Sequence, residues 1–325
     1  MFLYANQLMR VFRGHSRPVS APVVLAIGNF DGVHLGHAAL IGQLALAAKR
    51  HGLAATVLTF EPHPPEFFAP ASAPARLTTL REKLELLAEC GAEQAMICPF
   101  NAAFSALSAE EFIERVLLKG LQLRHLIIGD DFRFGRGRIG DFTLLQQAGQ
   151  RFGFTVEAMQ SVMVDGERVS SSGVRAALAA GDMEHAARLL GRPYIIDGRV
   201  AHGDKIGRQL GFATANIRIK HNPLPMTGVF AVQVSGLDAQ PLPAVANLGI
   251  RPTVGGTRPL LEVHLFDFDR DIYGKHISVR FVHKLRNEQR FPNFDALKAQ
   301  IAADAAAARE FFQRRGAEGT EGRRD

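Results

Sequence analysis

The chain has 325 residues, of which 47% are hydrophobic and 22% are charged, and its formal net charge is +6. This length favours two domains, and the composition is ordinary for globular domains with a buried core. No stretch approaches the roughly 20 consecutive apolar residues of a membrane span, and residues 1–17 lack a signal-peptide pattern. We therefore expect a cytoplasmic protein that does not bind membranes. The two cysteines fit neither a metal spacing nor a disulfide framework and are expected as buried thiols.

The excess of positive charge is compatible with nucleic acid or with small phosphorylated ligands. Basic residues are mostly scattered, and the chain has no Trp and only three Tyr, so a stacking surface for single strands would depend on Phe. We expect small anionic substrates and no nucleic acid. The alternative, a protein that grips a nucleic-acid backbone through Arg133–Arg138, predicts a strongly salt-dependent affinity for oligonucleotides.

Short apolar runs alternate with amphipathic segments between residues 20 and 160. This alternation predicts an α/β domain whose parallel sheet has helices on both faces. The expected strands are Val23–Gly28, Ala55–Phe60, Gln94–Cys98, His125–Gly129 and Phe154–Met159. The expected helices are Ala38–Arg50, Thr79–Cys90, Ala109–Lys119 and Phe142–Arg151.

The run Gly28–His37 is expected to form a tight turn between the first strand and a helix. Such a turn brings backbone N–H groups and a helix N-terminus to a ligand, which favours anions. His34 and His37 lie on one side of the first helical turn, where both can donate to phosphate oxygens. The run matches neither a dinucleotide fingerprint nor a Walker loop. The pair suits a nucleotidyltransferase, which stabilises a triphosphate as pyrophosphate leaves; the alternative is a turn with two solvated histidines.

Two further loops, Thr59–Pro65 and Gly129–Gly135, follow other strands of the same expected sheet. Ligands bind at the carboxyl ends of parallel strands, so we expect these loops to converge with the His34 turn on one edge. The run Ser170–Arg175 is a fourth candidate. Serines before a helix are first of all caps, but three of them with Arg175 one turn later are also suited to hold a phosphate.

The pattern changes at Gly191, beyond which short strand-like segments are repeatedly broken by Gly and Pro. They predict a small antiparallel β-barrel closed by the alanine-rich helix Phe294–Gln313. We expect domains at 1–187 and 188–315, followed by a disordered tail at 316–325. The expected barrel strands are Tyr194–Ala201, Val229–Ser235, Ala244–Leu248, Leu261–Phe266 and His276–Leu285.

The barrel half contains its own constellation of polar residues in the segment Gly203–Asn216. In an extended chain, Thr214 and Asn216 point to the same side, and their oxygens are ligands suited to Mg²⁺. The alternative is a polar barrel loop. Glu262 lies inside an expected strand, where it is either a general base or part of a solvated face.

Taken together, these motifs resemble those of the bacterial bifunctional riboflavin kinase/FMN adenylyltransferases, the prokaryotic FAD synthetases. The resemblance runs from about residue 20 to 310. The turn Gly28–His37, the Phe-Glu-Pro-His-Pro loop at Phe60, the Gly129–Gly135 loop and the serine run look like the family's adenylyltransferase module. The segments Gly207–Asn216, Asn247–Thr253, Leu261–His264 and Leu285–Glu288 look like its riboflavin kinase module.

The resemblance implies a Rossmann-like nucleotidyltransferase domain, a kinase barrel and two ATP-dependent steps. Riboflavin is phosphorylated to FMN in the barrel, and FMN is adenylylated to FAD in the first domain. For adenylylation it implies catalytic His34 and His37, an ATP and phosphate site at Gly28, Phe30, Asp31, Gly32, Asp131, Ser170, Ser171, Ser172 and Arg175, and a flavin loop at Phe60, Pro62 and His63. For the kinase it implies the base Glu262, an ATP site at Gly203, Lys205, Gly207 and Arg208, flavin contacts at Arg286 and Glu288, and Mg²⁺ ligands at Thr214 and Asn216.

The chain departs from the family pattern at two positions. Ala213 stands where the family has a proline, which removes a fixed φ angle beside the proposed metal ligands but keeps both of them. Ser172 stands where the family has a threonine, and a hydroxyl remains. The alternative function is a single-activity nucleotidyltransferase with a non-catalytic barrel; assaying FMN formation from riboflavin and ATP distinguishes the two.

Overall fold

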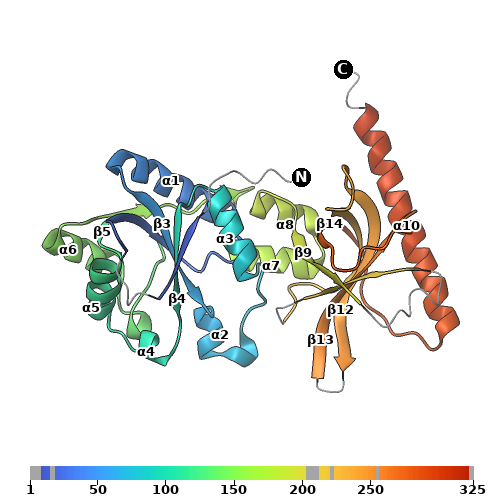
Figure 1. Cartoon of the computed structure of the whole chain (residues 1–325), viewed down its shortest axis with the longest axis horizontal. Coiled ribbons are helices and arrows are strands. Elements are labelled where there is room, and N and C mark those ends of the chain that lie inside the picture. Colours follow the sequence, from blue (N-terminus) through green and yellow to red (C-terminus); the bar gives the residue numbers. More distant parts are fainter. Residues whose placement is uncertain (1–8, 15–18, 203–211, 220–222, 254–255, 322–325) are drawn as a thin grey trace. The chain divides into compact units, whose positions relative to one another are not determined.

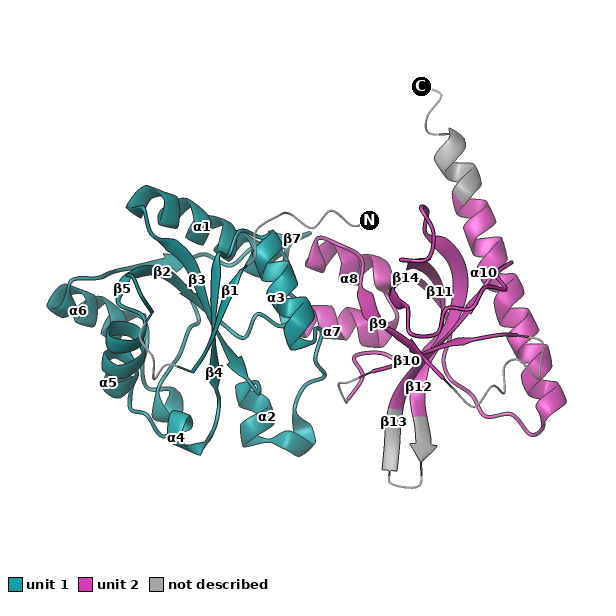
Figure 2. Cartoon of the chain, in the orientation of Figure 1, with its two compact units in different colours: residues 1–171 teal, residues 172–325 magenta. Residues whose placement is uncertain are grey.

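The computed structural model describes residues 9–14, 19–202, 212–219, 223–253 and 256–321. The chain divides into two compact units, Met1–Ser171 and Ser172–Asp325 (Figure 2). The boundary expected from the sequence, at 187/188, lies later in the chain than this division and stays a prediction. None of the described helices is both long and apolar enough to cross a membrane.

The first unit is an α/β domain with six parallel strands, of which Figure 1 labels β3, β4 and β5. Its strands are β1 Arg10–Arg13, β2 Val23–Ile27, β3 Ala54–Glu61, β4 Gln94–Pro99, β5 Leu123–Gly129 and β6 Thr155–Met159, with a small hairpin of β7 Met163–Val164 and β8 Glu167–Arg168. Its helices are α1 Leu35–His51, α2 Pro64–Phe68, α3 Leu80–Glu89, α4 Ala102–Ser105, α5 Ala109–Glu111 and α6 Phe142–Phe152, with a π-helical turn Phe112–Gly120 and 3₁₀ turns Pro70–Ser72 and Arg136–Arg138.

The strand order of this sheet is β1-β4-β3-β2-β5-β6. From β2 the chain first builds outward through β3 and β4, and then returns to the other side of β2 to add β5 and β6. The order therefore reverses between β2 and β5. In open parallel sheets, the crevice outside such a reversal is the usual ligand site.

Strand β2 is buried along its whole length and separates two apolar cores. Val23, Leu25 and Ile27 belong to the core on one face, while Val24 and Ala26 belong to the core on the other. Side chains alternate between the two faces of a strand, so a continuous apolar run is what a doubly covered sheet requires. The α/β fold expected from the sequence is confirmed.

The strand β1 was not expected, because its Arg-Val-Phe-Arg sequence does not form a continuous apolar run. It lies at the edge of the sheet, paired with β4, where a mixed composition is tolerated. The helix expected at Ala109–Lys119 is present, but from Phe112 it is wound as a π-helix, which periodicity alone does not reveal.

The second unit begins with helices α7 Ser171–Ala180 and α8 Met183–Leu190 and continues as a closed six-stranded barrel, in the order β10-β13-β12-β11-β14-β9. The neighbouring strands run antiparallel, which confirms the expected barrel. The strands are β9 Ile195–Ala201, β10 Ala215–Arg218, β11 Gly228–Ser235, β12 Leu242–Thr253, β13 Gly256–Leu265 and β14 His276–Arg286.

The C-terminal helix α10, Phe294–Glu321, packs on the barrel strands β11, β12 and β14 and extends farther than the sequence suggested. The disordered tail expected at 316–325 stays a prediction. Residues 322–325 lie outside the described part of the chain.

One glycine of the first unit leads to a stability prediction. The loop after β5 packs on the start of α5, where a Cβ on Gly135 would lie 2.7 Å from the backbone nitrogen of Ala109. Gly137 has a similar positive φ, +69° against +73°, but the nearest atom to its Cβ would lie 3.8 Å away. We expect Gly135→Ala to lower the free energy of unfolding by about 1–3 kcal/mol more than Gly137→Ala, because only the first adds a backbone clash to the left-handed strain. Urea unfolding followed by circular dichroism tests this; equal losses would contradict it.

Candidate active sites

A pocket of about 260 Å³ lies at the point of the first unit where the strand order reverses. It is formed by residues that follow the carboxyl ends of β2, β5 and β6, as expected for a ligand crevice in a parallel sheet. Two of the three loops singled out in the sequence, the Gly28–His37 turn and the Gly129–Gly135 loop, contribute to its wall. Its lining includes Gly28, Phe30, His34, Gly36, His37, Gly129, Asp131, Arg168 and Ser170.

The two histidines of the turn lie together at the start of α1. His34 is the N-cap residue, and its Nδ1 accepts a hydrogen bond of 3.3 Å from the backbone N–H of His37. The two rings stack with centroids 3.7 Å apart, and Phe30 meets the His37 ring edge-on at 5.3 Å. Because Nδ1 of His34 is an acceptor, the proton of its neutral ring is on Nε2. The structure therefore brings both predicted histidines to one pocket and holds their rings in a defined geometry.

The backbone of this turn is unusual for residues with side chains. Phe30 and Val33 have φ angles of +50° and +40°, in the left-handed region that favours glycine, and Gly32 lies between them at +82°. Such conformations cost on the order of 1–3 kcal/mol each and persist only when the surroundings hold them. The turn therefore needs support from other parts of the unit.

Asp31 provides much of that support. Its buried carboxylate accepts hydrogen bonds from the backbone N–H groups of Leu77 and Thr78, at 3.1 and 3.2 Å, and from the Thr78 hydroxyl. The Thr78 hydroxyl in turn accepts from the backbone N–H of Gly32. These contacts indicate that Asp31 anchors the turn to the segment before α3.

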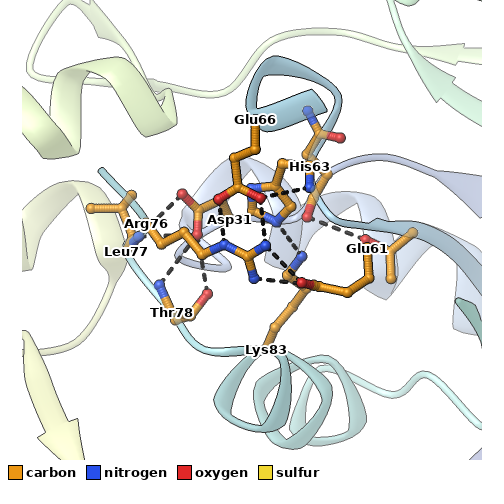
Figure 3. A network of polar contacts seen from close by, with 10 residues as sticks. Asp31, Glu61, His63, Glu66, Arg76, Leu77, Thr78 and Lys83 are labelled. Carbon is orange, nitrogen blue, oxygen red and sulfur yellow. Dashed lines mark hydrogen bonds and ion pairs between the residues drawn. The ribbon is translucent and has the colours of Figure 1, made fainter. Parts of the chain in front are cut away.

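The loop after β3 is held by a cluster of charged side chains, shown in Figure 3. Arg76 forms hydrogen-bonded ion pairs with both Glu61 and Glu66. The backbone N–H of His63 donates to Glu66 at 2.9 Å, and the His63 ring lies 2.6 Å from Nζ of Lys83. Hydrogen bonds to Glu66 and Glu61 raise the pKa of Arg76, so its guanidinium is charged at physiological pH. The predicted loop residue His63 is therefore buried and firmly held.

Phe60 and Pro62 lie in the same loop region. Phe60 belongs to a cluster of aromatic rings at the end of β3 and β4, with centroids 5.7 Å from those of Phe100 and Phe104. Phe68 in α2 extends this cluster and is 67% exposed. An exposed aromatic side chain is suited to stack on a flat aromatic ligand, although none of these residues lines the 260 Å³ pocket.

The remaining predicted residues of the first site lie around the pocket or follow it in the chain. Asp131 accepts a 2.7 Å hydrogen bond from Arg168, a residue of β8 that the sequence did not single out, and both line the pocket. Ser170 also lines it, while the Ser171 hydroxyl donates to the backbone oxygen of Asp31 at 2.9 Å. Ser172 and Arg175 follow in the first turns of α7, which the division assigns to the second unit.

In the barrel, strand register places three polar residues in one row. Asn216 of β10 pairs with Glu262 of β13, and Glu262 pairs with Asn247 of β12. Side chains of directly paired residues point to the same face, with Cβ atoms about 5 Å apart. The amide of Asn216 donates to the backbone oxygen of Thr214, at 3.4 Å. The carboxylate proposed as a base is therefore flanked by amides, and the two predicted metal ligands lie next to each other.

Two pockets meet at Thr214. One, of about 340 Å³, is lined by Glu262 and Asn247 and by apolar residues of α10 and the segment before it, among them Phe291 and Leu297. The other, of about 350 Å³, is lined by Thr214, Asn216 and the segment 268–273. Two adjoining pockets, with a carboxylate in the wall of one and a threonine hydroxyl at the junction, suit transfer of a group between two substrates.

Arg286 and Glu288, predicted to contact flavin, both line the 340 Å³ pocket. Arg286 is bound through two hydrogen bonds, of 2.8 and 2.6 Å, to the buried carboxylate of Asp304 in α10. Burial raises the pKa of Glu288, whose carboxylate lies so close to Gly249 that a Cβ there would meet it at 1.9 Å. The Arg286–Asp304 pair therefore connects the end of β14 to the closing helix beside the pocket.

Four predicted residues, Gly203, Lys205, Gly207 and Arg208, lie outside the described residues. Sequence reasoning also missed several residues that the structure places at the two sites. Lys83 and Arg76 belong to no recognisable sequence motif. Lys83 does occupy an apolar position of an amphipathic helix, and a lysine at a position expected to be buried is a signal that could have identified it. The missed residues are Glu61, Arg76, Thr78, Lys83 and Arg168 in the first unit, and Asn247 and Asp304 in the second.

The fold and these sites define a transferase with two candidate active sites, an α/β unit with a pocket suited to anions and a barrel suited to phosphoryl transfer. The chain belongs to the bifunctional riboflavin kinase/FMN adenylyltransferase family. Residues 16–173 match the family model for FAD synthetase, and residues 190–312 match that for riboflavin kinase. The curated enzyme of that name from Escherichia coli K12 is 51% identical, covering 94% of this chain and 98% of its own. The Pseudomonas fluorescens enzyme is 50% identical, with 93% and 97% covered.

Solved structures also resemble this chain, and one of them covers nearly all of it. It is described as a macrolide-efflux protein from Streptococcus pneumoniae and matches with a TM-score of 0.79 and 28% sequence identity, covering 93% of this chain and 99% of that one. Membership of the family establishes the function. The chain is a bifunctional enzyme of FAD biosynthesis that phosphorylates riboflavin to FMN and adenylylates FMN to FAD, with ATP as co-substrate in both steps. The expected family, transferase activities and small-molecule substrates are confirmed.

Proposed function

We propose that Glu262 is the general base of the kinase step and accepts the proton of the terminal hydroxyl of the ribityl chain. The observation that carries this proposal is the row Asn216–Glu262–Asn247, since it puts a carboxylate in the wall of a pocket that meets a second pocket at Thr214. Riboflavin occupies the pocket with the apolar lining, where Arg286 and Glu288 border the flavin, and ATP occupies the other. Phosphoryl transfer depends mainly on such positioning and on charge stabilisation.

Thr214 and Asn216 are proposed to hold Mg²⁺ in the kinase site. A hydroxyl and an amide oxygen are the hard ligands that this ion takes together with phosphate oxygens, so the donor set fits. When bound, Mg²⁺ supplies neutralisation of the charge on the transferred phosphoryl group. The hydrogen bond from the Asn216 amide nitrogen to the Thr214 carbonyl orients the amide, and the Ala213 carbonyl lies 2.9 Å from Nδ1 of His264. Both contacts hold this short segment in place although Ala213 replaces the family proline.

For adenylylation, the FMN phosphate attacks the α-phosphate of ATP and pyrophosphate leaves. The phosphate is already an anion, so the step needs no strong base. We propose that His34 and His37, together with Ser171, stabilise the charge that develops, while the loop Phe60–His63 borders the flavin. This part rests on the shared pocket of the two histidines and on their stacked geometry. Because both steps consume ATP, we place the enzyme in the cytoplasm.

The metal assignment is tested by titrating Mg²⁺. Asn216→Leu removes the proposed ligand at similar volume, and we expect the Mg²⁺ concentration needed for half-maximal FMN formation to rise about tenfold or more. Asn247→Leu is the matched control, because this amide flanks Glu262 on the opposite side and is not a proposed ligand. Its Mg²⁺ requirement should stay that of the wild type even if its rate falls. An unchanged requirement in Asn216→Leu, with FAD formation from FMN intact, would remove Asn216 from the metal site.

A further inference from the structure

Lys83 is a buried charged residue that has no role in either of the two reaction steps as proposed above. It lies in α3, its side chain is fully buried, and its Nζ is 2.6 Å from Nε2 of His63. A lysine is almost never fully buried unless it is paired. Here the partner is a ring in the loop proposed to border the flavin, which makes Lys83 a candidate for a role in positioning that loop.

The direction of the Lys83–His63 hydrogen bond follows from the protonation of the two groups. Burial, followed by the nearby charge of Lys83, lowers the pKa of His63 to about 4, so its ring is neutral at pH 7. Burial also lowers the pKa of Lys83, but only to about 8, so its ammonium is mostly charged at pH 7. An ammonium can only donate, so Nε2 of His63 accepts, and the single proton of the neutral ring is on Nδ1.

The segment that carries Lys83 is bonded to both loops of the site (Figure 3). Leu77 and Thr78 donate to Asp31 of the histidine turn, as described above. A few residues away, Arg76 binds Glu61 of the flavin loop and Glu66 of α2, and Lys83 binds His63 of the flavin loop. The segment 76–83 is therefore a connection between the turn that carries His34 and His37 and the loop that carries His63.

We propose that Lys83 is a positioning residue for adenylylation. Its Nζ donates to Nε2 of His63 and fixes the ring with its proton on Nδ1. This hydrogen bond holds the flavin loop in a fixed position relative to the histidine turn. The inference rests on the proposed role of the loop Phe60–His63 in binding FMN. Lys83 itself does not touch substrate. Its removal should therefore weaken FMN binding more than it slows the chemical step.

The first test replaces Lys83 by methionine, which keeps the length of the side chain and removes the donor. We expect the KM for FMN in adenylylation to rise about tenfold or more, as for loss of a hydrogen bond to a charged group, with a smaller change in kcat. FMN formation from riboflavin in the same preparation reports on the fraction of intact protein. Lys49→Met, at an exposed position of α1, is the matched control and should leave both activities unchanged.

The second test asks whether Lys83 acts through His63. His63→Gln should raise the KM for FMN, and adding Lys83→Met to it should raise the KM little further, because coupled residues are not additive. If the two effects multiply, or if Lys83→Met changes only the melting temperature and not the KM, the inference is wrong. If His63→Gln leaves the KM for FMN unchanged, it is the proposed role of the flavin loop that fails.

The third test needs no substitution and applies even if Lys83→Met does not fold. Because the pKa of Lys83 is near 8, its charge is present below this pH and is lost as the pH rises through it. A neutral amine is a weaker donor than an ammonium, and because it can also accept, it no longer requires Nε2 to be the acceptor. The KM for FMN of the wild type should therefore rise between pH 7 and 9.5, a range in which ATP and FMN phosphates have already lost their protons. A constant KM would contradict the inference. The titratable groups around Lys83 are His63 and Glu66 of the flavin loop and α2, Glu61 of β3, Asp31 of the histidine turn and Arg76.

A spectroscopic readout separates positioning from a purely structural role. In protein labelled with ¹⁵N at histidine, the His63 signals, assigned by their loss in His63→Gln, should show Nε2 as the unprotonated nitrogen at pH 7. In Lys83→Met we expect a shift toward the other tautomer or a mixture. A wild-type ring with its proton on Nε2 would overturn the proposed hydrogen bond.

Discussion

Glu262→Gln is expected to stop FMN formation from riboflavin, with a loss of about two to four orders of magnitude, while the same protein still converts supplied FMN to FAD. Glutamine has the size and polarity of glutamate but cannot accept the hydroxyl proton, and general-base catalysis typically contributes about this factor. The neighbours of Glu262 in the row, Asn216 and Asn247, can keep their packing. Chromatographic separation of riboflavin, FMN and FAD measures both reactions in one preparation.

FAD formation from FMN is the internal control for this variant, since the proposed adenylylation residues His34 and His37 lie in the other unit. Wild-type kinase rates in Glu262→Gln would show that Glu262 is an ordinary residue of a barrel strand and not the general base. Loss of both activities, with the protein still folded by circular dichroism, would show that the two sites are not independent.

His37→Ala is expected to have the opposite effect. FAD formation should fall by about two to three orders of magnitude, as for loss of one donor that stabilises developing charge, while FMN formation from riboflavin stays near the wild-type rate. The ring of His37 stacks on His34 and lines the pocket, so the substitution removes a donor and also exposes the face of the neighbouring ring. The measurement is the rate of pyrophosphate release with FMN and ATP.

The matched control is His51→Ala. His51 lies at the far end of the same helix, is exposed, and is not part of the pocket, so both activities should be retained. If both variants lost FAD formation equally, the effect would come from α1 as a whole and not from the phosphate turn.

The sequence predicts both folds well because each follows from a strong local pattern. The continuous apolar run Val23–Ile27 can only belong to a sheet covered on both faces, and the short Gly- and Pro-broken strands after Gly191 suit a barrel. The helix start at Leu35 was placed three residues late, because His34 is an uncommon capping residue. The strand β10 was not among the expected barrel strands, because it is only four residues long.

The candidate sites were predictable where motif residues themselves line the pockets, as His34, His37, Thr214 and Glu262 do. What the sequence could not reveal is the support of these residues by segments distant in the chain. The contact between Lys83 and His63 spans 20 positions and that between Asp31 and Leu77 spans 46, and neither leaves a local pattern. Such contacts depend on the tertiary fold and have no periodicity that one sequence can show.

The central claim is that two independent sites carry the two reactions, with FMN as the intermediate between them. It is tested most directly by mixing the two variants. From riboflavin, ATP and Mg²⁺, Glu262→Gln alone should form neither product, and His37→Ala alone should accumulate FMN. The mixture should form FAD, because FMN released by one protein is adenylylated by the other. A mixture that yields only FMN, although Glu262→Gln still converts added FMN to FAD, would mean that the intermediate is not released. A mixture that forms neither FMN nor FAD would contradict the independence of the two sites.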